Sequence, residues 1–310
     1  MEQAPTLLNQ AIVLDNGSGS TKVGFAGDDF PKAVFPAYVG RPKHVKVMGG
    51  GLTGLEFLVG ARAEKSRGLL KLAYPITHGI VQNWDDMEKI WHAAFEELKS
   101  EAREHPILLT EAPLNPYRNR ERAAEKLFET FGVPALFVSL QAMLTLYASG
   151  STSGVVLDCG DGVCHSVPVV DGFAVPSAIQ RIDIGGRDVT NHLQQLLRRS
   201  GHGFHSSAEL EIVREIKEKT CYVAVEGLRA EEQRFMSRMQ QSGKPTANPM
   251  ACDYASLDAE RFRAAEALFD PALLGTEFRG VHQKSPNKRV QWLQAQRAKK
   301  ILCTRRQPKK

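Results

Sequence analysis

Two aspartates, Asp15 and Asp158, lie in the same short pattern, which occurs twice in the chain. Residues 13–19 read VLDNGSG and residues 156–162 read VLDCGDG. In each copy an apolar run ends in the aspartate, a turn of glycines and small polar residues follows, and a second strand-like run comes next. Glycines let a backbone approach an anion closely, and successive N–H groups form a concave site for phosphate oxygens. Two such hairpin tips facing each other would bind a polyphosphate and its metal from both sides.

The residue types at the tips predict separate roles. Asp15 and Asp158 end apolar strands, where a carboxylate has no structural purpose, and we expect them to hold Mg²⁺ through water. Lys22, in the strand after the first turn, is placed to meet phosphate charge. Backbone N–H donors are expected from Ser18 and Gly19 in the first turn, and from Gly160, Asp161, Gly162 and Val163 in the second. The alternative is two ordinary turns with a hydrogen-bonding Asp, and the repetition of seven positions in register favours the phosphate site.

Two further polar side chains, Gln141 and His165, are candidates for positioning a water molecule. Gln141 lies in an apolar helical segment, where a lone amide is more often a satisfied buried group, and His165 alone is open to the same interpretation. If the two tips bracket a terminal phosphate, both side chains could orient an attacking water. Lys217 and Glu218 lie on a charged helix face, where a solvated network is the simpler interpretation.

A glycine-rich segment at 44–59 contains a second phosphate-type pattern, which we interpret differently. Residues 49–54, GGGLTG, satisfy G-x-G-x-x-G, but the following residues 55–59 are typical of a strand. A dinucleotide fingerprint needs a helix there, so a flexible hairpin loop is the favoured interpretation. The chain has no G-x-x-x-x-G-K-[ST] pattern, which excludes a nucleotide site of the P-loop kind.

Length and composition are ordinary for a globular protein with two domains. The chain has 310 residues, of which 42% are hydrophobic and 24% charged. We expect no signal peptide and no membrane span, and the five scattered cysteines indicate a reducing compartment. Residues 283–310 hold ten Lys and Arg and no acidic residue, so the net charge of +5 leaves −5 on residues 1–282.

The order of predicted elements divides the chain into three parts. Alternating strands and helices up to residue 149 predict a mostly parallel α/β domain, with a helix that Asn83 caps. The second hairpin, at 154–170, restarts this order and predicts a second domain over 150–282, with helices at about 187–199 and 207–220. Residues 226–257 show no pattern, and residues 283–310 are expected to form a basic tail without a core pattern.

Several motifs resemble those of the actin family. The resemblance covers residues 8–225 almost continuously and then 261–282. The motifs that carry it are LDNGSG at 14–19, KVGFAGD at 22–28, VGRP at 39–42, TEAPLNP at 110–116, D-x-GDGV at 158–163, GRD at 186–188 and IKEK-x-CY at 216–222. Within the family the chain is most similar to the centractin group, on residues RPKHV at 41–45, HPILL at 105–109 and NRERAAE at 119–125.

The resemblance implies a duplicated, actin-like (ribonuclease H-like) α/β ATPase fold, with two domains that flank a nucleotide cleft. It implies ATP or ADP with Mg²⁺, slow hydrolysis coupled to assembly, and a filament of actin-like subunits within dynactin, indirectly linked to dynein and microtubules. It implies a cytoplasmic, cytoskeletal location, including the centrosome. Gln141 and His165 match the water-positioning groups, and residues 44–59 match a loop that contacts the next subunit. Gly186, Arg214, Lys217 and Glu218 match the family's residues around the ribose and the base of the nucleotide.

Departures from the family pattern keep other functions open. The motif resemblance stops after His282, and no later adenosine-loop motif follows, so we expect an incomplete second domain. A conventional actin-like filament protein and a sugar-kinase-like enzyme of the same architecture are alternatives. A nuclear actin-related subunit is another, with the basic tail contacting nucleic acid, although a solvated tail is favoured over nucleic-acid binding.

Overall fold

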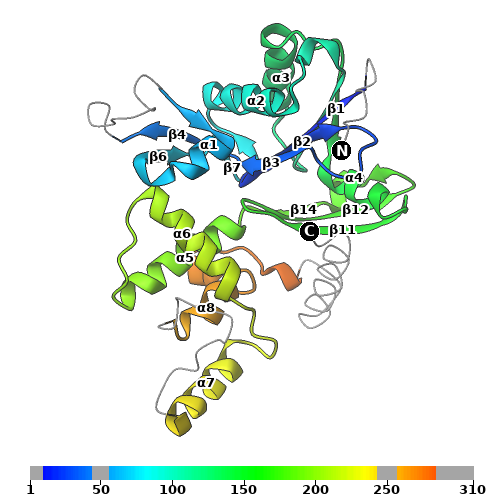
Figure 1. The fold of residues 1–310 in the computed structure, drawn as a ribbon. Coiled ribbons are helices and arrows are strands. Elements are labelled where there is room, and N and C mark those ends of the chain that lie inside the picture. The colour runs from blue at the N-terminus through cyan, green and yellow to red at the C-terminus, as the bar shows by residue number, and fades with distance from the viewer. Residues whose placement is uncertain (1–9, 44–55, 243–256, 284–310) are drawn as a thin grey trace. The chain divides into compact units, whose positions relative to one another are not determined.

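The chain forms two compact units in a computed structural model that describes residues 10–43, 56–242 and 257–283 (Figure 1). The first unit reaches Gly186 and includes Ser206–Ala208, and the second comprises Arg187–His205 and the described residues from Glu209 onward. The boundary between the compact units lies at Gly186, whereas the internal sequence repeat restarts near residue 150. The second hairpin therefore belongs to the first compact unit.

The first unit is built on a five-stranded sheet with the order β10-β9-β1-β2-β3. Strand β1 pairs antiparallel with β2 and parallel with β9, and β9 pairs parallel with β10. The strands are β1 (Ile12–Asn16), β2 (Ser20–Phe25), β3 (Ala33–Pro36), β9 (Ile107–Glu111) and β10 (Leu136–Leu140). This arrangement places the ends of β1 and β9 side by side, at the edge where a ligand site is expected.

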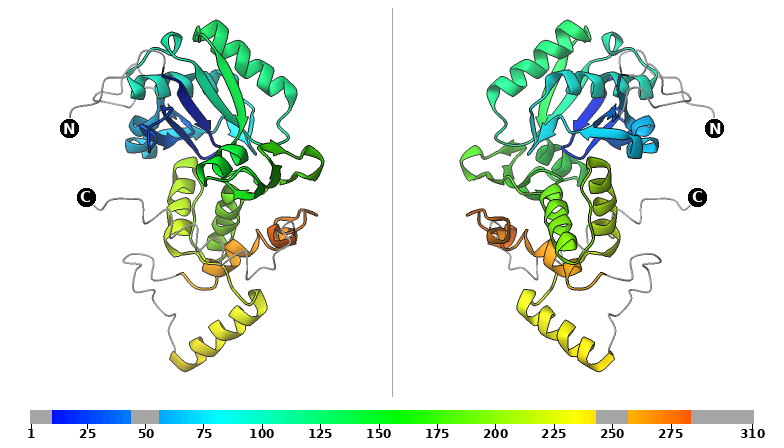
Figure 2. Two further views of the ribbon diagram at one scale, coloured as in Figure 1. Left: turned by 90° about the vertical axis from the view of Figure 1, so that its right-hand side faces the viewer. Right: turned by 90° about the vertical axis from the view of Figure 1, so that its left-hand side faces the viewer.

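Helices α2 (Trp84–Leu98) and α3 (Tyr117–Glu125) cover this sheet (Figures 1 and 2). The predicted cap is confirmed, since the Asn83 side chain accepts a hydrogen bond of 3.1 Å from the Asp86 N–H. Apolar residues at helical spacing on α2, including Ile90, Trp91 and Ala94, are at most 1% exposed. Beyond α3 the helix widens into a π-helical turn at Lys126–Thr130.

The second hairpin repeats the first in register. It consists of β11 (Gly154–Cys159) and β12 (Cys164–Val170), with β13 (Phe173–Ala174) and β14 (Gln180–Ile182) on the far side of β12. Asp15 lies opposite Lys22 in the first hairpin, and Asp158 lies opposite His165 in the second. Helix α4 (Gln141–Ala148) packs on the inner face of the second hairpin. The predicted repetition is therefore a repetition of backbone geometry.

A small sheet completes the first unit. Its order is β5-β4-β6, from β4 (Val39–Pro42), β5 (Leu58–Val59) and β6 (Leu70–Ala73), with helix α1 (Gly60–Lys65) packed on it. A short β7 (Ile76–Thr77) and β8 (Ile80–Val81) form a further hairpin. Of the glycine-rich segment, residues 44–55 lie outside the described residues, and the strand expected at 55–59 is confirmed at Leu58–Val59.

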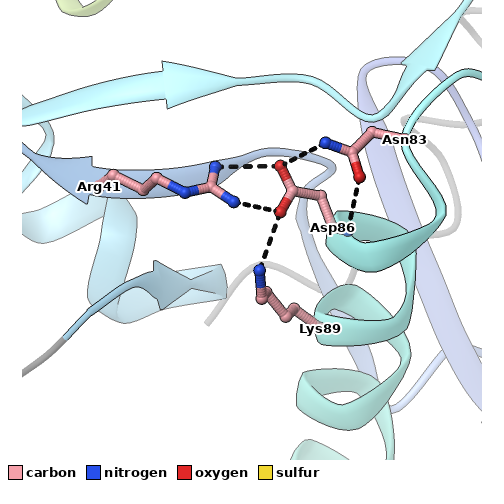
Figure 3. A network of polar contacts seen from close by, with 4 residues as sticks. All are labelled: Arg41, Asn83, Asp86 and Lys89. Carbon is pink, nitrogen blue, oxygen red and sulfur yellow. Dashed lines mark hydrogen bonds and ion pairs between the residues drawn. The ribbon is translucent and has the colours of Figure 1, made fainter.

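A buried carboxylate joins this small sheet to α2 (Figure 3). Arg41 of β4 binds both oxygens of Asp86, one at 3.0 Å, and Lys89 donates to the same carboxylate at 3.1 Å. The Lys89 ammonium also lies 4.9 Å from the ring centre of Phe57, next to β5. The first two turns of α2 are therefore in contact with β4, through Arg41, and with Phe57 next to β5.

The second unit is helical. Helices α5 (Gly186–Arg199) and α6 (Ser207–Thr220) share a core of Val189, Leu193, Leu197, Val213 and Ile216, which confirms both predicted helices. The expectation of no pattern at 226–257 is wrong for Leu228–Ser242, which form helix α7 and stand apart from α5 and α6 in Figures 1 and 2. This segment is rich in strong helix formers but lacks a continuous apolar face. It is held by contacts such as Phe235 to Phe262 of α8 (Glu260–Glu266).

Among the described residues, no helix is long and apolar enough to span a membrane. Cys159, Cys164 and Cys221 lie outside any disulfide. In the same part of the chain, no three His, Cys, Asp or Glu side chains gather as a direct metal site.

Candidate phosphate-binding site

The two hairpin tips line one cavity of about 510 Å³ within the first unit. Of the residues predicted from the sequence, the cavity is lined by Asp15, Ser18, Gly19, Lys22, Gln141, Asp158, Gly160, Asp161, Gly162, Val163 and His165. Asn16, Gly79, Thr110 and Thr145 also line it and were not predicted as site residues. The structure therefore brings together the predicted residues of both copies around a single space.

Both tips are tight turns closed by the same backbone bond. The Gly17 N–H donates to the Ser20 carbonyl at 3.0 Å, and the Gly160 N–H donates to the Val163 carbonyl at 2.8 Å. The sequence predicts this equivalence because Gly17 and Gly160 both stand two residues after the aspartate. Each aspartate consequently ends its strand at the same distance from its turn.

The tips touch each other at positions where only glycine fits. A Cβ on Gly19 would lie 2.8 Å from the Asp161 Cβ, and a Cβ on Gly162 would lie 2.6 Å from the Ser18 Oγ. The Ser18 Oγ accepts a hydrogen bond of 3.0 Å from the Gly79 N–H, which also fixes the β7–β8 turn against the first tip. Because the glycines lack side chains, the backbones of both tips reach the cavity directly.

A hydrogen-bonded network holds Asp15 in the cavity wall. Its Oδ2 lies 2.8 Å from the Lys22 Nζ, and its Oδ1 accepts from the Thr110 Oγ1 at 2.6 Å and the Gln141 Nε2 at 2.8 Å. Burial raises the pKa of Asp15, but attraction to Lys22 and these hydrogen bonds outweigh it and hold the pKa below the usual 3.8. Asp15 is therefore a carboxylate at neutral pH, already oriented by three donors.

The second tip presents a different group opposite its aspartate. His165 is 3% exposed, and neither ring nitrogen has a hydrogen-bond partner among the described residues. Burial lowers the pKa of His165, attraction to Asp158 raises it in part, and repulsion by Arg181 lowers it further, so the pKa lies below 6.5. The ring is neutral at pH 7, and one of its nitrogens can accept a hydrogen bond from a molecule in the cavity.

Asn16 also places an unsatisfied group at this site. Its Oδ1 is buried without a hydrogen-bond partner in the described part of the chain, and Asn16 lines the cavity. Buried polar atoms in folded proteins are normally hydrogen-bonded, so the Asn16 and His165 atoms suit a polar ligand or ordered water. The donors, glycines and carboxylates present fit a polyphosphate with a water-coordinated divalent cation.

Of the four residues matched to the nucleoside side, Gly186 lies next to the second tip, and the other three lie on α6 of the second unit. The Gly186 N–H donates to the Gly160 carbonyl at 2.9 Å, next to the second tip. Arg214 and Glu218 lie on α6 of the second unit and form an ion pair of 3.1 Å, and Arg214 also pairs with Glu211 at 2.7 Å. Burial lowers the pKa of Arg214, but the two carboxylates outweigh it and raise the pKa above its usual value. The assignment of Arg214, Lys217 and Glu218 stays a prediction.

Comparison with known proteins identifies the class. A sequence model of the family described as actin matches residues 6–297, which extends past His282, where the resemblance of individual motifs ends. An "Actin-like protein" of Neurospora crassa is 55% identical over 285 residues, which cover 90% of this chain and 73% of the relative. The chain belongs to the actin family. The expected actin-like α/β fold is confirmed, and members of this family generally bind ATP or ADP with a divalent metal and assemble with other actin-like subunits.

Proposed function

We propose that the chain binds ATP or ADP with Mg²⁺, with the polyphosphate in the cavity between the two tips. The observation that carries this proposal is the contact of two equivalent glycine turns around one cavity, at Gly19 and Gly162. Backbone N–H groups of Ser18, Gly19 and residues 160–163 would bind phosphate oxygens, and Lys22 would supply positive charge. Asp15 and Asp158 would hold the cation through water, and the cation would neutralise part of the phosphate charge.

The same site supports slow hydrolysis. The Gln141 amide is oriented by its hydrogen bond to Asp15, and the neutral His165 ring has nitrogens that no described residue satisfies. Both would orient a water molecule for attack on the terminal phosphate, which is the role such side chains have in nucleotide hydrolysis. On the nucleoside side we propose Gly186, Arg214, Lys217 and Glu218. The in-register hairpins support two homologous domains, 1–149 and 150–282, followed by a basic tail at 283–310.

Thermal unfolding with a ligand series tests the phosphate site. All ligands are used at one concentration, about 100 times the dissociation constant of MgATP; MgATP should then raise the unfolding temperature by roughly 5 °C or more, and ADP and inorganic triphosphate with Mg²⁺ should also raise it. Adenosine should raise it far less, because it brings no phosphate to the tips. Stabilisation by adenosine equal to that by ATP, together with no stabilisation by triphosphate, would contradict the proposed site.

We further propose that the protein is a filament subunit of the centractin group. The residues that support this are those at 41–45, 105–109 and 119–125, and the similarity to the "Actin-like protein" of Neurospora crassa supports the wider cytoskeletal role. The proposed setting is cytoplasmic dynactin, with dynein and microtubules as indirect partners. Sedimentation of the purified chain with and without ATP tests assembly, and copurification with dynactin subunits tests the group. Assembly without dynactin association would favour a conventional actin-like filament.

A further inference from the structure

Two of the cysteines that lie outside any disulfide stand directly opposite each other in the second hairpin. Cys159 ends β11, Cys164 begins β12, and the register pairs the two residues. The turn bond from the Gly160 N–H makes the next pair toward the tip a hydrogen-bonded one. Because bonded and non-bonded pairs alternate along an antiparallel ladder, the cysteines form a non-hydrogen-bonded pair, in which the side chains lie closest.

The separation of such a pair is close to that of a disulfide. Its Cα atoms lie about 4.5 Å apart, within the range of about 4.4–6.8 Å that disulfides span. Its Cβ atoms lie about 4.5–5.5 Å apart, against about 3.8 Å in a disulfide, so the strand ends need to approach each other for the bond to form. The first hairpin has Asn16 and Thr21 at the equivalent register. Of the two tips, only the second therefore has a pair of thiols.

The two cysteines differ in exposure. Cys164 is 1% exposed, whereas Cys159 is half-buried. Neither lines the phosphate cavity, and the pleat places both on the hairpin face opposite Asp158 and His165, which do line it. A small oxidant can therefore reach Cys159 without entering the cavity, and Cys164 lies beside it to complete a disulfide.

We propose that Cys159 and Cys164 are a reversible redox site, at which a small disulfide such as oxidised glutathione forms an internal disulfide that controls the second tip. The Cys159 thiolate attacks one sulfur of oxidised glutathione and displaces one glutathione thiolate. The Cys164 thiolate then attacks the Cys159 sulfur, the internal S–S bond forms and the second glutathione leaves. Two electrons pass to the oxidant, and the two thiol protons end on the two glutathione molecules.

The disulfide acts on the phosphate site because the second tip is closely packed. A Cβ on Gly185 would lie 2.5 Å from the Asp161 carbonyl oxygen, and a Cβ on Gly162 would lie 2.6 Å from the Ser18 Oγ of the first tip. Drawing the strand ends together therefore displaces backbone donors of the tip. MgATP should bind roughly 10-fold more weakly to the oxidised chain, as for the loss of one hydrogen bond to a charged group. This consequence rests on the proposed nucleotide function, whereas the disulfide itself does not.

Peptide mapping of the full chain tests the redox site. Trypsin cleaves after Lys126 and Arg181, and the peptide 127–181 contains Cys159 and Cys164 and no other cysteine. After treatment with millimolar oxidised glutathione and alkylation of the remaining thiols, this peptide should be unalkylated and lighter by two hydrogen atoms. Dithiothreitol should restore both alkylation sites. Two alkylated cysteines after oxidation, or a glutathione adduct without the internal bond, overturn the proposal.

Three variants and a titration with MgATP complete the test. Cys159→Ser and Cys164→Ser should each abolish the internal bond. Cys221→Ser is the control and should retain it, since burial raises the pKa of the Cys221 thiol to about 11 and makes it a poor nucleophile.

Oxidation should weaken MgATP binding in the wild type and in Cys221→Ser, but not in Cys159→Ser. Equal affinity of the reduced and the disulfide-bonded chain overturns the control of the second tip. Absence of MgATP binding by the reduced chain contradicts the proposed nucleotide function instead, and the peptide map then decides on the disulfide by itself.

Discussion

Lys22 and His165 occupy equivalent positions in the two hairpins, each directly opposite its aspartate, and both line the same cavity. Their chemistry is different. The Lys22 ammonium forms an ion pair of 2.8 Å with Asp15, whereas His165 is a buried ring whose pKa is held below its usual value, mainly by burial. The duplicated backbone thus presents a charged ammonium group on one side of the cavity and a neutral imidazole ring on the other.

Removal of the Lys22 charge should weaken nucleotide binding. Lys22→Met should raise the dissociation constant for MgATP roughly 10- to 100-fold, since hydrogen bonds to charged groups contribute about 1.5–3 kcal/mol. Equilibrium titration with ATP measures this change. Lys71→Met, at an exposed position of β6, is the matched control and should leave the affinity unchanged. Equal affinity in both variants would exclude Lys22 as a phosphate ligand.

The contact between the tips should not tolerate a methyl group at Gly162. A Cβ there would lie 2.6 Å from the Ser18 Oγ and 3.2 Å from the His78 Cα. Gly162→Ala should therefore lower the free energy of unfolding by about 2 kcal/mol and weaken ATP binding at least 10-fold. Gly68→Ala is the control, because a Cβ at Gly68 meets no atom within 4 Å. Chemical denaturation and ATP titration of both variants provide the comparison.

Stability should depend on pH through His165. Because the folded-state pKa is lowered, the unfolded chain binds a proton below pH 6.5 that the folded chain does not bind. The free energy of unfolding of the ligand-free protein should therefore fall as pH decreases from 7.5 to 5.5, by at most about 1.4 kcal/mol per pH unit for one group.

Urea denaturation of His165→Gln should show a smaller fall over the same pH range, and the control His205→Gln, at an exposed position, should match the wild type. His192, whose pKa burial also lowers, should contribute to the fall that remains in His165→Gln. A pH dependence that His165→Gln does not alter would contradict the neutral, buried state of this ring.

The ion pair of Arg41 with Asp86 should matter more than surface pairs of the same type. The Asp86 side chain is 2% exposed, so Arg41→Ala leaves a buried carboxylate with Lys89 as its remaining cation. We expect a loss of about 2 kcal/mol, less than for a fully buried pair because Arg41 is 42% exposed. Arg62→Ala removes an exposed pair with Glu96 and should cost under about 0.5 kcal/mol. Similar unfolding midpoints for the two variants would contradict this ranking.

Features that are determined by residues close together in the sequence could be predicted from the sequence alone. Both hairpins, the Asn83 cap and helices α5 and α6 follow from local patterns of glycines, capping residues and apolar spacing. The role of Gln141 at the cavity was predicted only from repetition and resemblance, because a lone amide in an apolar helix carries little information by itself.

Other parts of the site depend on contacts between residues far apart in the sequence. Thr110 donates to Asp15 because β9 lies beside β1, and a pattern within either strand does not contain that pairing. Its position at the end of a buried strand is the one available signal. Helix α7 was missed for a different reason: its strong helix formers lack the apolar face on which the sequence interpretation relied.

Titration calorimetry of the purified chain with ATP, with and without Mg²⁺, tests the central claim most directly. We predict saturable binding at one site per chain, tighter with Mg²⁺ than without it, and at least 10-fold weaker in Gly162→Ala but not in Gly68→Ala. No detectable heat or saturation with millimolar MgATP, or equal binding by the two glycine variants, would contradict a phosphate site between the two hairpin tips.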